Sequence, residues 1–266
     1  MSRRFNPGSF ALTAFSVLIL LILIAPIVII FLVSFTPTEM LHFPPPGFSL
    51  RWYEAYFTDP KWLTATRVSF VVAAFTALFS LVIGFAIAVA LVRYRFFGKA
   101  GLRMLVMSPM ILPKIIIAVG LYFLYVKLRI LGTTGALVMA HSIIAIPYVV
   151  MIVTASLYSF DRRLEWAAQS LGASPLRAVW RVTIPNLKPA ILGGGLFAFV
   201  ASFDDIILSL FLTKLTEPTL PRQIWVNVQQ TIDPTIAAVS TFMTVVSVLG
   251  LWLVALAQRG MKKGAR

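Results

Sequence analysis

The sequence has no cysteine and few charged residues. Only 9 of its 266 residues are Asp or Glu, and 12% are charged, against roughly 25% in an average soluble domain. Without cysteine, the chain has no disulfide and no thiolate for catalysis or metal binding. The pattern G-x4-G-K-[S/T] is also absent, so ATP is not bound through a P-loop. These absences argue against an enzyme and leave no catalytic residue to name.

Long apolar runs are present instead, and hydrophobic residues make up 59% of the chain. A helix needs about 20 mostly apolar residues to cross roughly 30 Å of hydrocarbon. No run alternates in the manner of a lipid-facing strand. The sequence therefore predicts an all-α integral membrane protein, a single transmembrane domain over residues 1–266. The six expected spans are residues 10–33, 68–92, 104–126, 135–157, 189–213 and 237–257.

Positive charge dominates the charged residues, with a formal net charge of +14. Such an excess could mark a nucleic-acid-binding surface. If the N-terminus is inside, however, fifteen of the 23 Lys and Arg residues fall on the inner side, seven fall outside, and Lys114 lies within the third run. This distribution follows the positive-inside rule. It predicts cytoplasmic termini and a lipid bilayer, with no nucleic acid, as the partner of the basic residues.

Two outer loops carry patterns of their own. In the first, Trp52, Tyr53, Tyr56 and Phe57 form a cluster typical of aromatic residues at the outer headgroups. In the last, LPRQIWVNVQQ at residues 220–230 predicts a short surface helix.

A polar stretch with small residues, EWAAQSLGASPLRAVWRVTIP at residues 165–185, lies in the long inner loop 158–188. Asp161 is placed to cap a helix over 164–171. Gly172 suits the left-handed residue that ends such a helix, and Ser174-Pro175 can begin another. Pro185 and Pro189 are expected to break the chain before the next span. We predict a helix–Gly–helix elbow whose small residues form a docking surface on the cytoplasmic side.

The elbow carries a recognisable spacing, AA-x3-G-x9-[IV]-x-[IL]-P, which resembles the EAA loop of ABC-importer permeases. Further segments, FAFVASFDDIILSLFL, TLPRQIWVNV and DPTIAAVST, look like the polyamine (spermidine/putrescine) branch. The resemblance implies a type I permease bundle, similar to the methionine permease, in a bacterial inner membrane. It also implies coupling to a cytoplasmic ATPase pair through Glu165, Trp166, Ala167, Ala168, Gly172 and Pro185.

The same resemblance implies further partners: a second, non-identical permease subunit and a periplasmic substrate-binding protein, with no cofactor. One residue departs from the pattern. The family's usual Glu falls at Trp166, and Glu165 lies one residue earlier. On a helix this shift rotates the carboxylate by about 100°, so the contact that this Glu makes with the ATPase does not carry over directly.

Charged residues within the fifth run are the candidate substrate-pathway residues. Asp204 and Asp205 follow Phe203, and buried charges of this kind cost about 2.5–3.5 kcal/mol each on insertion scales. They could attract a cationic substrate, or they could pair with Lys114 or with backbone at a helix break. Adjacent helical residues point about 100° apart, so the two acids are expected to differ. His141 is expected to hydrogen-bond across the bundle rather than to bind metal.

Three hypotheses remain. The first is a permease subunit that imports polyamines with ATP hydrolysed elsewhere, and the same machine could carry ferric iron or an organic phosphonate. The second is an ion-coupled carrier that uses Asp204 and Asp205, although no internal repeat is visible. The third is a membrane scaffold, which would not need buried acids.

Overall fold

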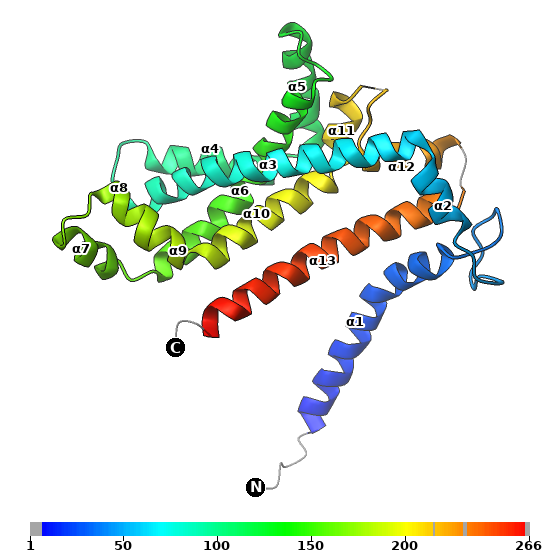
Figure 1. The fold of residues 1–266 in the computed structure, drawn as a ribbon, viewed down its shortest axis with the longest axis horizontal. Helices are drawn as coiled ribbons and strands as arrows, with labels where there is room; N and C mark the ends of the chain where they lie inside the picture. Colours follow the sequence, from blue (N-terminus) through cyan, green and yellow to red (C-terminus); the bar gives the residue numbers. More distant parts are fainter. Residues whose placement is uncertain (1–6, 215, 231–232, 264–266) are drawn as a thin grey trace. The chain divides into compact units, whose positions relative to one another are not determined.

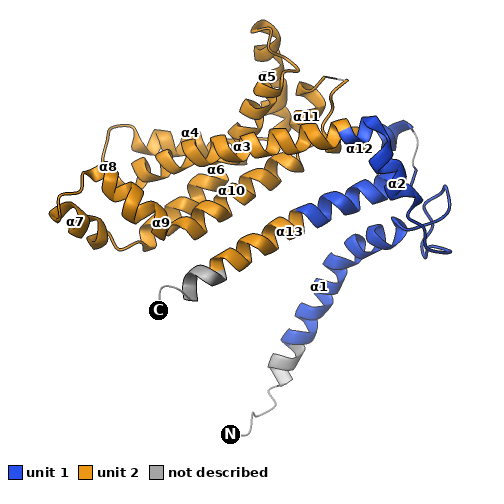
Figure 2. Ribbon diagram, in the orientation of Figure 1, with its two compact units in different colours: residues 1–63, 226–246 blue, residues 64–225, 247–266 orange. Residues whose placement is uncertain are grey.

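The computed structural model describes residues 7–214, 216–230 and 233–263. Every regular element in that part of the chain is helical. It divides into two compact units (Figure 2), residues 1–63 with 226–246 and residues 64–225 with 247–266. Each unit is described by itself, and the candidate functional residues lie in the second.

The first unit contains α1 (Pro7–Val33), α2 (Arg51–Thr58) and the beginning of α13 (Thr235–Lys263). The expected aromatic cluster lies on α2, but Trp52 and Tyr56 are buried rather than presented to headgroups. The Trp52 indole donates to the Thr36 carbonyl at 2.8 Å, and the Tyr56 ring lies 5.4 Å from that of Phe242. These two aromatic residues therefore pack the core of this unit, while Phe57 remains exposed.

Three long helices build the second unit: α3 (Pro60–Arg93), α6 (Thr134–Ser159) and α10 (Lys188–Phe203) (Figure 1). Small residues allow close approach between them. A Cβ on Gly195 of α10 would lie 2.8 Å from Leu81 of α3, and a Cβ on Gly84 would lie 2.8 Å from Val149 of α6. A side chain at Gly195 or Gly84 would therefore clash with the facing helix.

The expected third span is divided into α4 (Lys99–Ile111) and α5 (Lys114–Lys127), whose axes differ by 105°. The cause is Pro113, which has no N–H and pushes the preceding residue out of helical geometry. Leu112 accordingly has φ −73° and ψ 137°. The break leaves Lys114 at the first position of α5.

The expected fifth span is also interrupted. It consists of α10 and the short α11 (Ile207–Leu212), with Asp204 to Ile206 between them. The short surface helix predicted near residues 220–230 is α12 (Leu220–Gln230). Arg222 of α12 donates to the carbonyl groups of Thr213 and Lys214 at 2.6 and 3.1 Å, and it thereby caps the end of α11.

The predicted elbow is present as α7 (Arg163–Ser170), α8 (Pro175–Ala178), the π-helical segment η1 (Val179–Thr183) and α9 (Ile184–Asn186). Asp161 accepts the N–H of Arg163 at 2.9 Å, Gly172 has φ +86°, and Ser174 caps α8. The chain bends by 75° between Asn186 and Lys188. Pro185 itself does not break the helix, because it lies in the first turn of α9.

Four helical segments of the described residues are long and apolar enough to cross a membrane: Leu12–Val33, Pro60–Arg93, Thr134–Ser159 and Thr235–Gln258. Two bent pairs, Lys99–Lys127 and Pro175–Phe203, raise the number to six if each pair is one span. The all-helical membrane fold expected from the sequence is confirmed, and two of its spans are broken.

Candidate functional site

The two adjacent acids at the end of α10 lie in different environments. Asp205 is buried, with 1% of its side chain exposed, and its carboxylate accepts Lys114 Nζ at 2.7 Å. Its other oxygen accepts the N–H of Leu208 at 2.8 Å, at the beginning of α11. Asp205 therefore joins α5 to the helix break, because both of its oxygens are used.

Asp204, in contrast, is exposed and lines a cavity of about 210 Å³. In the described part of the chain no side chain forms an ion pair with it. Lys114 lines the same cavity, but its ammonium group is engaged by Asp205. Two carboxylates and one ammonium group therefore lie near the cavity. Because the ammonium group is paired with Asp205, the exposed Asp204 carries the negative charge that is not balanced. The remaining lining residues are Pro109, Met110, Leu112, Ile144, Tyr148, Val200 and Ala201.

Phe203, the third expected pathway residue, is placed elsewhere. Only 1% of it is exposed, and its ring packs against Phe199 and Phe70 at 5.4 and 5.0 Å. Tyr148 of α6 was not expected at the cavity, since the sequence showed only that it follows Pro147. The α6 helix continues through Pro147, and an aromatic residue beside a helical proline is a signal that could have pointed to it.

His141 forms the cross-bundle hydrogen bond that was expected. Its Nδ1 lies 2.7 Å from the Ser202 hydroxyl, which joins α6 to α10, and the side chain is fully buried. Ser202 lies three residues before Asp205, near the end of α10, so the contact holds the end of the helix that precedes both acids.

The candidate coupling residues of the elbow divide between two faces of α7. Trp166 and Ala167 are exposed, Ala168 is half-buried, and Gly172 is exposed with nothing within 4 Å of the position where a Cβ would lie. Pro185, on α9, is also exposed. Among these candidates Trp166 has the one large exposed side chain, whereas Ala167, Ala168 and Gly172 are small.

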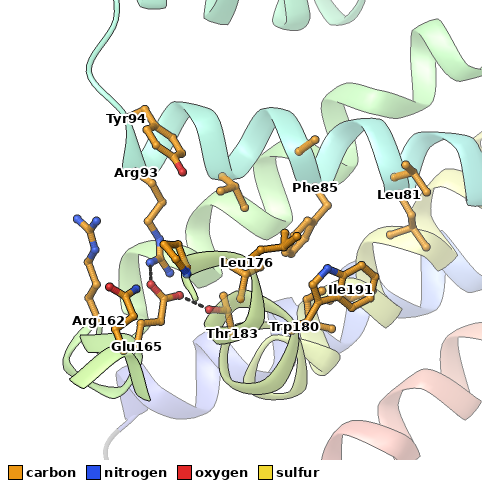
Figure 3. Close-up of a pocket in the computed structure, with 17 residues that line it drawn as sticks. Leu81, Phe85, Arg93, Tyr94, Arg162, Glu165, Leu176, Trp180, Thr183 and Ile191 are labelled. Atoms are coloured by element: carbon orange, nitrogen blue, oxygen red, sulfur yellow. Dashed lines mark hydrogen bonds and ion pairs between the residues drawn. The ribbon is translucent and has the colours of Figure 1, made fainter. Parts of the chain in front are cut away.

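Glu165 lies on a different face of α7 from Trp166 and is buried, with 4% exposed. Its carboxylate forms an ion pair with Arg93, in the last turn of α3, and accepts a hydrogen bond from Thr183 of η1 (Figure 3). The guanidinium of Arg93 also lies 5.6 Å from the ring of Phe160, the residue that ends α6. Arg93, Glu165 and Thr183, which we call the elbow clamp, border an apolar groove of about 790 Å³.

Burial decides how much the elbow clamp contributes to rigidity. Exposed ion pairs contribute about 0–1 kcal/mol, whereas removing one partner of a buried pair costs about 3–5 kcal/mol because a buried charge loses its compensation. The side chains of Arg93 and Glu165 are 10% and 5% exposed. The elbow clamp therefore contains a buried ion pair, and it holds α7 against α3.

The fold is that of the membrane subunits of ABC importers. The chain resembles a subunit of a bacterial ABC transporter that imports the acidic polysaccharide alginate, with a TM-score of 0.75 and 16% identity over 96% of this chain and 98% of that chain. The MetNI methionine transporter gives a TM-score of 0.62 and 17% identity over 74% of this chain and 94% of that chain. At these identities the likeness shows the fold alone.

Sequence comparison gives the family. Residues 80–263 match the model of binding-protein-dependent transport system inner membrane components, and the chain belongs to this family of inner-membrane proteins. It is 32% identical to the spermidine/putrescine transport system permease protein PotC of Haemophilus influenzae, over 97% of both chains. It is also 32% identical to the putrescine permease PotI of Escherichia coli, over 83% of this chain and 81% of that protein. These relatives are transporter subunits rather than enzymes.

Proposed function

We propose that this chain is a permease subunit of an ATP-driven importer of polyamines. The observation that carries the proposal is the similarity to a spermidine/putrescine permease along 97% of both chains. Substrate would pass from a periplasmic binding protein through this chain and a second, non-identical permease subunit. A pair of cytoplasmic ATPase subunits would dock on the elbow and drive the passage.

The charge at the cavity supports a cationic substrate. A polyamine carries several positive charges, and a low-dielectric path needs negative charge to accept them. Because Lys114 is bound to Asp205, Asp204 is the carboxylate at the cavity that is available to an ammonium group. Tyr148 on the same wall adds a ring, and rings attract cations through their faces. The pathway role therefore centres on Asp204, with Asp205 as its support.

Uptake by the complete assembly tests the proposal. The wild-type complex with its binding protein and ATPase should take up labelled spermidine or putrescine when ATP is supplied. Asp204→Asn should lower that uptake by roughly tenfold, which corresponds to about 1.4 kcal/mol. Glu54→Gln, which removes a carboxylate from an exposed position on α2, is the matched control and should leave uptake unchanged.

Two results would contradict the proposal. One is ATP-driven uptake of an anion such as molybdate or a phosphonate, or of ferric iron, without uptake of polyamines. The other is uptake by the purified chain alone when only a proton gradient is supplied, since that would indicate an ion-coupled carrier.

A further inference from the structure

Two adjacent residues of the elbow differ sharply in exposure. Trp166 is 55% exposed, and Glu165 is 4% exposed, on a helix of only eight residues. The exposed face, with Trp166, Ala167 and Gly172, is available to a docking partner. The carboxylate of Glu165 is not, because Arg93 and Thr183 occupy both of its oxygens.

The elbow clamp joins segments that are far apart along the chain. Glu165 lies 72 residues from Arg93 and 18 residues from Thr183. Arg93 is in the last turn of α3, whose 34 residues form one of the long apolar helices. A displacement of α7 is therefore transmitted to α3 through two charged groups that cannot separate without leaving a buried charge uncompensated.

We propose that Glu165 is a positioning residue that locks the elbow to the end of α3, so that motion imposed on the elbow becomes motion of the transmembrane helix. The inference rests on the proposed function only in assuming an ATPase that moves the elbow. It assigns Glu165 to force transmission within the chain, and the docking contact to Trp166 and its small neighbours.

A distance measurement tests the lock without any substrate. The chain has no cysteine, so Leu78→Cys on α3 and Ser170→Cys on α7, both at exposed positions, would carry the only spin labels on this chain in the assembled transporter. The distribution of distances between them should be narrow and should keep its mean when ATP is added. Glu165→Gln should broaden it. A distribution that is equally narrow in the variant would overturn the proposal.

Coupling supplies the second measurement. In the full complex, Glu165→Gln should retain ATPase association while the ATP hydrolysed per substrate transported rises about fivefold or more, the range typical of a lost coupling between sites. Thr183→Val should shift the ratio in the same direction by less, and Thr183→Ser, which keeps the hydroxyl, should match wild type. Loss of ATPase association in Glu165→Gln would instead assign the carboxylate to docking.

A failure of this inference is distinguishable from a failure of the proposed function. If the substrate is not a polyamine, spermidine uptake fails in wild type while the narrow distance distribution remains. If Glu165→Gln does not fold into a stable chain, the charge-reversed pair Arg93→Glu with Glu165→Arg provides another test. Recovery of a folded chain and of the narrow distribution supports the clamp, and continued failure contradicts it.

Discussion

Two buried ion pairs connect distant helices of this chain, and they differ in how far the basic partner reaches solvent. At the elbow, Arg93 and Glu165 are 10% and 5% exposed. At the helix break, Asp205 is 1% exposed, but Lys114 is 44% exposed and borders the cavity. Both partners of the first pair are buried, whereas only the acidic partner of the second pair is buried.

The difference in exposure of the basic partner indicates what each ion pair can do. A pair with both partners buried resists separation from either side, which suits a mechanical connection. A pair with one partner at a cavity can exchange that partner for water or for a substrate group. In both places the neighbouring residue, Trp166 or Asp204, is exposed and remains available to something outside the chain.

The largest effect on stability is expected from Lys114→Met. This change leaves the buried Asp205 carboxylate with only the Leu208 N–H, and a buried charge without its counter-charge costs about 3 kcal/mol or more. Thermal unfolding of the purified chain in detergent measures it. The double variant Lys114→Met with Asp205→Asn should recover most of the loss, since no buried charge then remains; an equally unstable double variant would show that Lys114 stabilises the fold by another route.

A smaller effect is expected from Asp205→Asn alone. The amide oxygen can still accept the Leu208 N–H, and Lys114, already 44% exposed, can be solvated through the cavity. We expect a loss of about 1–1.5 kcal/mol, the contribution of one hydrogen bond to a charged group. The same unfolding measurement compares the loss of stability in Asp205→Asn with that in Lys114→Met. A larger loss in Asp205→Asn would show that Lys114, and not only Asp205, depends on the pair for its burial.

The sequence allowed the elbow to be predicted because its signals are local. Gly172 ends a helix through its left-handed backbone, and Ser174 caps the next helix through its side chain; both are found in those roles. Asp161 accepts the N–H of Arg163 near the start of α7, but the N-cap position itself is Arg162, whose side chain makes no cap hydrogen bond. The sequence also predicted that Asp204 and Asp205 would differ, on the assumption that both lie on a helix. The structure does place them in different environments, but in the break that follows α10.

The elbow clamp and the broken spans could not be predicted in the same way. The partner of Glu165 lies 72 residues away, and nothing near Arg93 indicates that it bonds to an elbow residue. The third and fifth spans each form one apolar run, and hydropathy counts residues without detecting a bend. Pro113 was a local sign of the first break. The second break was named only as an alternative, in which an acid pairs with Lys114 or with backbone at a helix break, and the structure shows Asp205 making both contacts.

At the elbow, Gly172 offers a matched pair of substitutions. Gly172→Ala should cost about 1 kcal/mol, because φ +86° disfavours any side chain while open space surrounds it. Hydrogen exchange of the α7 amide groups should accelerate accordingly. Gly172→Arg carries the same backbone cost and also places a long cation on the docking face, so it alone should abolish ATPase association or coupled transport. Normal coupled transport by Gly172→Arg would place the docking surface elsewhere.

The smallest effect should come from an exposed ion pair, which tests whether burial rather than pairing gives the other two their strength. Arg51 and Glu39 lie 3.5 Å apart with side chains 47% and 82% exposed. Because water screens both charges, Glu39→Gln should change stability by less than about 0.5 kcal/mol. Unfolding of wild type and variant at low and high salt checks this, since the small difference should vanish in high salt. A loss comparable to that of Asp205→Asn would mean that pairing alone, without burial, explains the stability of all three contacts.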